Sequence, residues 1–423
     1  MIKGPKGCPD ILPGKTEALY IVISFIRETV ENFGYREIIT PVFEHREIFE
    51  RSVGENTDIV EKEMYTFKDK GGRDLSLRPE GTAPVVRAYI EHGMKSLPQP
   101  VKLYYFGPMF RYERPQMGRQ RQFFHFGIEA LGDESPYLDV EVINLALIIL
   151  KKLGLKNLSV KINSIGCKKC RPKYREALKE YLKPRYEKLC DDCKRRFYSN
   201  PLRILDCKKE SCKRETENAP RIIDFLCDEC REHFEKVLEL LDILGVKYEI
   251  DNRLVRGLDY YTRTVFEIQS GDLGAQNAVL GGGRYDDLSE SMGGKKTPGV
   301  GFAMGIERLM ILLEKTGNLP YRERKTIYIL PISEADYIDA FKLYMDLGEE
   351  GSSVFIPYKP KKLKSGVTDA VKRNASYLII VGGEERERGN VILKDLSRKV
   401  QEEISLTDIK ERIKQLEERN GKK

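Results

Sequence analysis

Leu254–Thr262 reads LVRGLDYYT, and further along the chain Gly281–Leu288 reads GGGRYDDL. A single arginine beside two tyrosines, followed by a run of glycines, indicates a polar pocket rather than a packed core. Between the two stretches, Thr264–Ile268 alternates polar and apolar residues, which predicts a half-buried strand. The glycines allow the backbone to approach a ligand closely, because no Cβ stands in the way. Either stretch alone could equally be a turn, but the two together favour a ligand pocket.

An arginine-rich loop lies upstream of this pair. Gly107–Phe123 is expected to form a strand, a loop and a second strand, and the loop carries Arg111, Arg114, Arg119 and Arg121. A guanidinium can hold two phosphate oxygens at once and keeps its charge at any ordinary pH. Four such groups on one loop repel one another unless an anion or water separates them. The loop therefore predicts a phosphate site, with a solvated basic hairpin as the alternative.

The cysteines form a third pattern, because eight of the nine fall within one segment in four close pairs. In chain order the first two pairs make C-x2-C-x19-C-x2-C, which fits a zinc template, and the last two make a looser C-x4-C-x14-C-x2-C. Four thiolates can close a tetrahedral structural Zn²⁺ site, while disulfides and free buried thiols are the alternatives. The order does not say which pairs share an ion. The candidate ligands are Cys167, Cys170, Cys190, Cys193, Cys207, Cys212, Cys227 and Cys230.

The cysteine segment is also the basic part of the chain. Residues 166–238 hold 20 Lys/Arg and 14 Asp/Glu, a net charge of +6 out of +7 for all 423 residues. Helix-forming residues dominate it, so we expect a small, helical, cysteine-rich insertion. Its charge is compatible with nucleic acid, and a solvated helical face is the alternative.

The flanking sequence predicts an α+β fold. Helical periodicity covers Glu17–Asn32 and Leu138–Leu153, and strand-like runs include Val101–Phe106, Phe123–Ala130 and Ser159–Ile165. These elements do not alternate in a βαβα rhythm, which favours an antiparallel sheet flanked by helices. After residue 320, four short apolar strands separated by helical patterns predict an α/β module. They are Lys325–Pro331, Ser353–Pro357, Tyr377–Val381 and Asn390–Leu393.

The two opening stretches resemble the two signature motifs of histidyl-tRNA synthetases. Three other segments are similar to the three motifs of class II aminoacyl-tRNA synthetases, namely Glu37–Glu44, Gly107–Phe123 and Gly299–Leu309. The resemblance extends over nearly the whole chain. It implies a class II antiparallel-sheet catalytic domain in two parts, residues 1–165 and 239–320, interrupted by the insertion at 166–238. The module at 325–423 resembles the anticodon-binding domain of the same family.

By this resemblance the arginines bind ATP, which enters with Mg²⁺. Arg111 is expected to grip the α-phosphate, Glu113 to contact the adenine amine, and Arg121 belongs to the same loop. Arg308 is expected to brace the γ-phosphate. Arg256 is implied at the α-phosphate, opposite the attack, where other class II enzymes often place a metal. Arg256, Arg111 and Arg308 are thus the expected catalytic residues.

The resemblance also implies a histidine pocket. Glu80, Thr82 and His125 are expected to hold the substrate ammonium, while Glu129 and Tyr261 contact the imidazole. His125 departs from the family, which has glutamine there, and an imidazole cannot reproduce the two-way hydrogen bonding of an amide. The full expected set is Glu80, Gly81, Thr82, Arg111, His125, Glu129, Arg256, Tyr260 and Tyr261.

The expected activity is ATP-dependent ligation of L-histidine to its tRNA through a histidyl-adenylate. One alternative is a non-catalytic paralogue that serves as regulatory subunit of ATP phosphoribosyltransferase. The other is a zinc-stapled nucleic-acid-binding protein without catalysis. The first motif implies a homodimer. The sequence shows no signal peptide and no apolar run of membrane-spanning length, so we expect a soluble, cytoplasmic protein without membrane contact.

Overall fold

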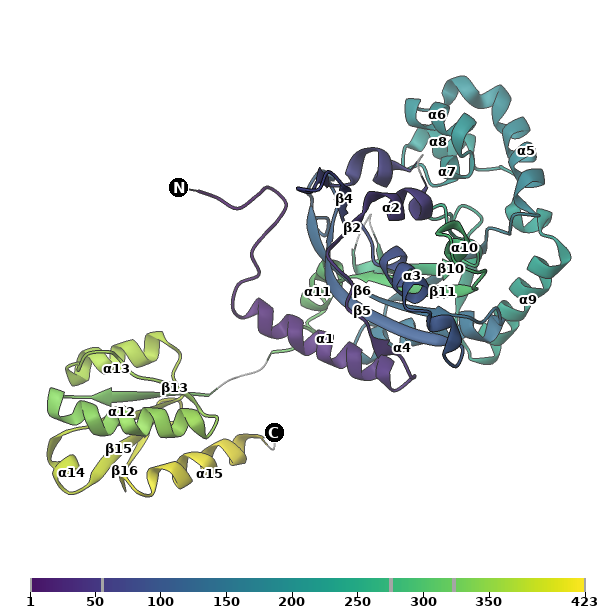
Figure 1. Ribbon diagram of the computed structural model, residues 1–423. Helices are drawn as coiled ribbons and strands as arrows, with labels where there is room; N and C mark the ends of the chain where they lie inside the picture. Colours follow the sequence, from purple (N-terminus) through teal and green to yellow (C-terminus); the bar gives the residue numbers. More distant parts are fainter. Residues whose placement is uncertain (1, 55–56, 274–276, 322–324, 422–423) are drawn as a thin grey trace. The chain divides into compact units, whose positions relative to one another are not determined.

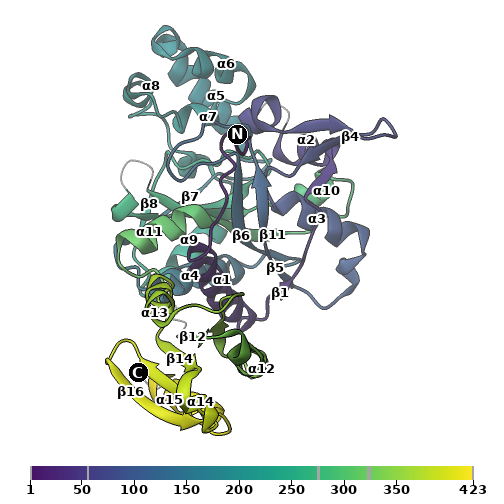
Figure 2. The ribbon, with the colours of Figure 1, turned by 90° about the vertical axis from the view of Figure 1, so that its left-hand side faces the viewer.

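The computed structural model describes residues 2–54, 57–273, 277–321 and 325–421. The chain divides into two compact units, residues 1–320 and residues 321–423. Figures 1 and 2 show the ribbon coloured along the chain, with the first unit in purple to green and the second in yellow-green to yellow. Within the described part of the chain, no helix combines the length and apolar character that a membrane span requires.

The first unit is built around an eight-stranded sheet in the order β1-β5-β6-β11-β10-β9-β7-β8. Its six central strands are antiparallel, and only the edge pairs β1/β5 and β7/β8 are parallel. This confirms the expected α+β architecture. The strands are β1 Arg36–Glu37, β5 Val101–Phe110, β6 Gln122–Leu131, β7 Leu158–Ser164, β8 Tyr248–Ile250, β9 Thr262–Ser270, β10 Ala278–Arg284 and β11 Gly299–Gly305.

Two long helices, α1 (Lys15–Glu31) and α4 (Pro136–Lys152), pack against this sheet. Helix α4 begins where Ser135 caps it, accepting a hydrogen bond from the Tyr137 amide, and Pro136 stands at its first turn. The apolar residues of both helices share one core with apolar side chains of β6, β9 and β11. Burial of these faces fixes the helices to the sheet.

A smaller sheet and several short helices complete the first unit. Strands β2 (Phe43–His45), β4 (Asp74–Leu77) and β3 (Thr66–Lys68) pair in that order. The neighbouring helices are α2 Arg46–Val53, α3 Thr82–Glu91 and α10 Leu288–Ser291, while α11 Ile306–Lys315 packs against β6 and β11 of the large sheet. Short helical turns lie at Ile59–Glu63, Met94–Ser96 and Gly271–Leu273.

The segment that carries the cysteines is helical. Helices α5, α6, α7 and α8 gather at one end of the first unit in Figures 1 and 2, while α9 lies along α4. Apolar side chains of α5 and α7 share a core with Val255 and Tyr260 of the opening signature. Helix α9 runs through residue 238 without a break. The bounds are α5 Arg171–Leu182, α6 Asp191–Ser199, α7 Leu202–Leu205, α8 Glu210–Glu215 and α9 Asp228–Ile243, with short turns at Lys183–Lys188 and Ile222–Phe225.

The second unit is an α/β module with a five-stranded sheet in the order β13-β12-β14-β15-β16. The first three strands are parallel and the last two antiparallel, and helices cover both faces. Strand β16 was not anticipated, because its sequence VQEEIS is largely exposed and lacks the apolar run of a buried strand. The elements are β12 Thr326–Pro331, α12 Glu334–Glu349, β13 Ser353–Phe355, α13 Leu363–Lys372, β14 Tyr377–Val381, α14 Gly383–Glu387, β15 Asn390–Asp395, β16 Val400–Ser405 and α15 Ile409–Gly421.

Candidate active site

Arg256 of the first signature stretch packs against Gly281 of the second. Its guanidinium lies 3.2 Å from Glu267 of β9 and 5.7 Å from the centre of the Tyr261 ring. A Cβ at Gly281 of β10 would stand 2.3 Å from Nη2 of Arg256, so any larger residue there would displace the guanidinium from this position. Among the described residues, buried Nε of Arg256 has no hydrogen-bond partner. The arginine therefore keeps a donor for a ligand.

A closed network of buried carboxylates lies in the same unit. Thr82 donates from Oγ1 to Oε1 of Glu129 at 2.6 Å, and Tyr285 donates to the other oxygen of Glu129. Glu80 accepts from the amides of Thr82 at 2.7 Å and Ala83 at 2.8 Å, at the beginning of α3. Glu80 therefore caps this helix as well as facing the pocket. The hydroxyl of Tyr260 lies 3.5 Å from Oε2 of Glu80.

Gly81 and Gly127 leave room for an aromatic wall of this pocket. A Cβ at either position would lie 2.3 Å from the ring of Tyr105, a buried residue of β5. The rings of Tyr260 and Tyr261 lie 4.7 Å apart, and Tyr285 contacts Tyr260 edge-on at 5.8 Å. Buried aromatic rings and two buried carboxylates thus lie together, and this polar cluster is the candidate pocket for a small polar ligand.

Burial controls the charge of Glu129. Desolvation raises the pKa of Glu129 to about 8, against the partial compensation of the hydrogen bonds from Thr82 and Tyr285. Burial also raises the pKa of Glu80, although two backbone amides donate to it. At neutral pH the free pocket therefore holds Glu129 largely protonated.

Replacing Glu129 with glutamine should change how stability depends on pH. The folded-state pKa of about 8 exceeds the ordinary 4.5, so the stability contributed by the neutral carboxyl is full below about pH 4.5. It is lost as the pH rises through about 8. Glutamine has no charge to bury, so the unfolding free energy of the variant relative to the parent should rise by a few kcal/mol from about pH 5 to about pH 8. Urea unfolding at a series of pH values measures this difference.

The matched control is Glu314→Gln, at an exposed position of α11, which should leave the pH profile of stability unchanged. A Glu129→Gln difference that stayed constant across the pH range would contradict the neutral carboxyl.

His125 stands on β6 beside the same pocket. Burial, with the positive charges of Arg111, Arg78 and Arg308, lowers the pKa of His125 to about 3. The imidazole is therefore neutral at physiological pH. Within the described residues its buried Nδ1 has no hydrogen-bond partner. One ring nitrogen is thus free to bond a ligand, in place of the two groups that an amide would offer.

The arginines expected to bind ATP converge near this pocket. Arg308 begins α11 and donates to the carbonyls of Gly118 at 3.3 Å and Ala278 at 3.0 Å. Its pKa is lowered by burial and by the nearby charges of Arg119 and Arg111. Arg111 donates to the carbonyl of Pro79 at 2.9 Å. Guanidiniums this close to one another favour the binding of an anion among them.

Two expected ATP residues have partners of their own. Glu113 lies 3.1 Å from Arg119, and its carbonyl accepts from Arg121 at 3.2 Å. The guanidinium of Arg121 stacks over the Tyr112 ring at 4.0 Å. Arg121 therefore shapes the loop through its own contacts, while Arg111 and Arg308 form the cationic group with Arg119.

A cleft of about 420 Å³ separates the arginine loop from the cysteine-rich segment. Arg111, Glu113 and Arg119 line one side. The other charged residues of its lining are Arg196, Arg203, Lys208, Lys209, Asp58, Glu63, Asp192 and Asp206. Asp58 pairs with Arg196 at 2.5 Å and lies 3.8 Å from Arg203.

Arg284, the arginine of the second signature, binds other residues of the protein and is not available to a ligand. Arg284 is fully buried and pairs with Asp139 of α4 at 2.5 Å and with Asp286 at 3.1 Å. It also donates to the carbonyls of Asp133 and Ser135, both at 3.0 Å. These bonds tie β10 to the beginning of α4 and point the guanidinium away from the pocket.

The sequence expectations missed several residues of the site. Tyr285 and Glu267 stand in or beside the signatures, but only the structure shows their bonds to Glu129 and Arg256. Glu307, beside Arg308, accepts from the Phe124 amide at 2.9 Å, and burial raises its pKa to about 7. The closeness of these residues to the motifs in the sequence was a usable signal. The partners of Tyr285 and Glu307 are remote in the sequence and gave no such signal.

Arg78 was also missed, although it precedes Glu80 in the same loop. It donates to the carbonyl and hydroxyl of Thr40 at 2.9 and 3.0 Å and to the carbonyl of Pro108 at 2.9 Å. One buried guanidinium thus joins the first motif, the Glu80 loop and β5.

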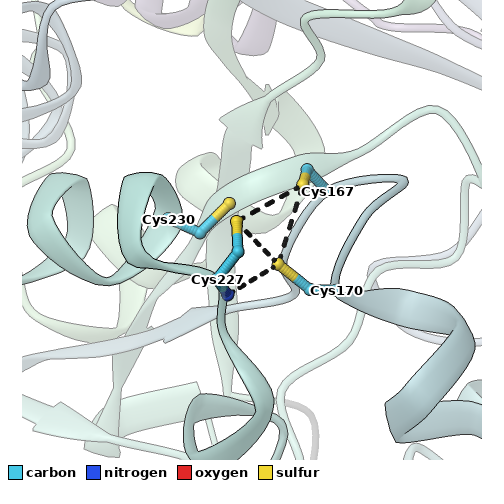
Figure 3. A group of neighbouring side chains, drawn as sticks. All are labelled: Cys167, Cys170, Cys227 and Cys230. Carbon is cyan, nitrogen blue, oxygen red and sulfur yellow. Dashed lines mark hydrogen bonds between the residues drawn. The ribbon is translucent and has the colours of Figure 1, made fainter.

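The cysteines form two groups, but not in chain order. The first pair meets the last, so that Cys167, Cys170, Cys227 and Cys230 lie together (Figure 3), and the two middle pairs, Cys190, Cys193, Cys207 and Cys212, form the second group. The sequence left open which pairs come together, and the structure joins them differently from the C-x2-C-x19-C-x2-C template. The spacing described a local template, whereas the helices bring the two ends of the segment back together.

The fold and the site together define a class of protein. A mostly antiparallel sheet carries an arginine loop, a glycine-rich strand that leads to Arg308, and a buried polar cluster around Thr82 and Glu129. These are the features of the catalytic domain of a class II aminoacyl-tRNA synthetase, followed here by a separate α/β unit.

Comparison with known proteins identifies the family. The model for histidyl-tRNA synthetase matches residues 7–309, and the model for an anticodon binding domain matches residues 326–416. The chain is 50% identical to a histidine–tRNA ligase of Halothermothrix orenii over 98% of this chain and 99% of the relative. It is also 50% identical to one of Thermoanaerobacter pseudethanolicus, over 98% and 100%. The chain belongs to the histidyl-tRNA synthetase family.

A solved structure agrees with this assignment. The apo histidyl-tRNA synthetase of S. aureus superimposes with a TM-score of 0.82 at 39% identity, covering 97% of this chain and 99% of that one. The match covers both units of the chain.

Proposed function

We propose that this protein activates L-histidine with ATP and transfers it to the tRNA specific for histidine. The observation that carries the proposal is the buried Thr82–Glu129–Tyr285 network, together with His125, which lies near the positive charges of Arg111 and Arg308. It occurs in a chain that spans 99% of a curated histidine–tRNA ligase at 50% identity.

The first step joins histidine to AMP. A carboxylate oxygen of histidine attacks the α-phosphorus of ATP, the bond to the β-phosphate oxygen breaks, and pyrophosphate leaves with the Mg²⁺ that ATP carries as part of the substrate. In the second step a hydroxyl of the terminal tRNA ribose attacks the acyl carbon and AMP leaves. Both steps need alignment of the reacting groups and neutralisation of charge.

The arginines supply that neutralisation. Arg111 and Arg308 hold the triphosphate from two elements, and Arg256 acts as charge partner of the α-phosphate. The unused Nε donor of Arg256 supports this role. Glu113 contacts the adenine amine through the carboxylate oxygen that Arg119 leaves free.

The pocket residues select histidine. Glu80, Thr82 and neutral His125 hold the ammonium, with the free Nδ1 of His125 as acceptor. Glu129 and Tyr261 contact the imidazole. Gly81 and Tyr260 shape the pocket around the substrate. A site that hydrogen-bonds both imidazole nitrogens rejects apolar isosteres strongly, because they would leave its buried polar groups unpaired.

The tRNA contacts both units in this proposal. The acceptor end enters the cleft beside the arginine loop, whose lining includes Arg111, Arg119, Lys208 and Lys209. The unit at 321–423 contacts the anticodon. A regulatory subunit of ATP phosphoribosyltransferase is not favoured, because the chain keeps the anticodon-binding unit and Arg256.

Deleting Tyr321 onward should separate the two halves of the reaction. The chain divides into two compact units after residue 320, and the first unit has its own hydrophobic core. ATP–pyrophosphate exchange should therefore persist in the truncated protein. Aminoacylation of tRNA should weaken, because the anticodon contacts are lost. Parallel assays of exchange and charging measure both effects. An equal fall in the two rates would assign the C-terminal unit to structural support.

We also propose a cytoplasmic homodimer built on the first motif. Ile39 is 86% exposed in the single chain and Phe43 49%, with Phe67 beside it, which is a large apolar area for a free surface. Light scattering should give about twice the chain mass of 48.8 kDa. Ile39→Asp should shift the mass toward the monomer, and Ile338→Asp, at an exposed position of α12, should not. A monomeric parent would contradict the dimer.

A further inference from the structure

We propose that this chain binds two structural zinc ions in a nested arrangement. The outer site consists of Cys167, Cys170, Cys227 and Cys230, and the inner site of Cys190, Cys193, Cys207 and Cys212. In each group the sulfurs all lie within 4.8 Å of one another. The ninth cysteine, Cys8, belongs to neither group.

The sulfur spacing matches a tetrahedral ion. Zn–S bonds of about 2.3 Å place the four sulfurs of a tetrahedral site about 3.8 Å apart. In the outer group Cys167 lies 3.6 Å from Cys170 and 3.9 Å from Cys227, and Cys170 lies 3.3 Å from Cys227. Figure 3 shows these sulfurs turned toward one another from two separate segments. In the inner group Cys190 and Cys207 are 3.9 Å apart.

Backbone amides around both groups already point at sulfur. The Lys169 amide donates to Cys167 at 3.3 Å and the Cys227 amide to Cys170 at 3.1 Å. In the inner group the Cys190 amide donates to Cys212 at 3.3 Å. Such donors stabilise thiolates, which are the form that binds a metal.

Basic side chains compensate the charge of the proposed centres. Zn²⁺ with four thiolates carries two net negative charges. Lys169 and Arg171 lie close enough to the outer group to interact with its sulfur, and Arg196 does so at the inner group. Two of these cations also pair with carboxylates, Lys169 with Glu229 at 2.8 Å and Arg196 with Asp58 at 2.5 Å, so they supply part of the compensating charge.

The outer site would close the root of the insertion. Cys167 and Cys170 follow β7 and lead into α5, while Cys227 and Cys230 begin α9. Cys170 and Cys230 are buried in the main core of the first unit. A shared ion therefore fixes the place where the inserted segment leaves the sheet and the place where it returns.

The inner site would hold the short helices that support the Arg256 loop. Arg203, on α7, donates to the carbonyl of Gly257 at 2.6 Å. Arg253 donates to the carbonyls of Leu205 at 3.1 Å and Lys213 at 3.1 Å. These hydrogen bonds fix the backbone at Gly257 and the side chain of Arg253, on either side of Arg256 in the sequence. Because α6 and α8 are short, a metal ion that joins them would stabilise the helices that make these hydrogen bonds.

Zinc analysis of full-length variants tests the nested arrangement. The parent, purified under reducing conditions with zinc supplied, should hold two zinc ions per chain, and the matched control Cys8→Ser should hold the same number. Changing the four outer cysteines to serine should leave one ion. Changing Cys167, Cys170, Cys190 and Cys193 to serine should leave none, since that set takes two ligands from each site.

Pairing in chain order would reverse the results of the two fourfold variants, and that reversal would overturn the proposal. X-ray absorption of the parent provides a readout that does not depend on how the variants fold. It should show four sulfurs per zinc at about 2.3 Å. Oxygen or nitrogen ligands, fewer than two bound ions, or a mass lower by two hydrogens for each disulfide would each contradict the two sites.

Hydrogen exchange tests the role of the inner ion separately. In Cys193→Ser, the amides of residues 253–259 should exchange faster than in the parent, while those of the C-terminal unit should not change. If residues 253–259 exchanged at the parental rate after loss of one ion, the inner site would have no part in supporting the Arg256 loop.

Discussion

Arg256→Ala should lower the rate of ATP–pyrophosphate exchange by about 100-fold or more, the usual scale for loss of one transition-state charge partner. The guanidinium is held by Glu267 and lies over Tyr261, and it retains an unused donor on Nε. Such a group is positioned before the substrate arrives, so its charge acts on the developing transition state without reorganisation. Initial rates of exchange at saturating histidine and ATP measure the effect.

Two controls separate chemistry from folding in this experiment. Arg256→Lys keeps the charge but loses the planar fork, so its rate should fall between those of the parent and the alanine variant. The unfolding midpoint of Arg256→Ala should stay near the parental value, because the arginine is partly exposed and has one ion-pair partner. An alanine variant within a few-fold of the parental rate would remove Arg256 from the mechanism.

Arg284→Ala should act on stability instead. Among the residues that the structure describes, removing Arg284 leaves Asp139 with only the His233 imidazole at 3.2 Å and Asp286 with only Arg263 at 3.7 Å. Breaking a buried pair in this way costs about 3–5 kcal/mol. Thermal and urea unfolding measure the loss. A variant within about 1 kcal/mol of the parent, which is the range of an exposed pair, would contradict the buried network.

The pH dependence of this loss has a definite sign. In the parent, the pKa of Asp139 is lowered to about 2, chiefly by the charge of Arg284 and despite a burial effect that raises it. The pair therefore stabilises the fold above the ordinary carboxyl pKa of 3.8, and its contribution disappears as the pH falls toward about 2. The deficit of Arg284→Ala should accordingly be largest near neutral pH and shrink in acid. A double variant, Arg284→Met with Asp139→Leu, should recover part of the stability, because it buries no charge at that pair.

These two arginines mark the limit of prediction from sequence. Both stand in short stretches with glycine and tyrosine neighbours, and the local pattern does not distinguish them. Gly281 opens space for Arg256 from a neighbouring strand, whereas Asp139, 145 residues away in the chain, captures Arg284. The direction of each side chain depends on its partners, and the local sequence does not show where those partners lie.

Elsewhere in the chain, too, features with a local sequence pattern were predictable and features that depend on distant partners were not. The strands around Val101–Phe106 and Phe123–Ala130 were predictable because alternation and apolar runs are local properties. The exposed strand Val400–Ser405 has no such pattern and was missed. The nested cysteine groups depend on how five helices fold back on themselves. The neutral state of His125 depends on three arginines from separate segments.

ATP–pyrophosphate exchange with each of the twenty amino acids in turn tests the central claim most directly. The pocket of Glu80, Thr82, His125 and Glu129 and the guanidiniums of Arg111, Arg256 and Arg308 predict exchange with histidine and background rates with the other nineteen. Exchange driven by a different amino acid, or by none, would contradict the assignment of this site to histidine activation.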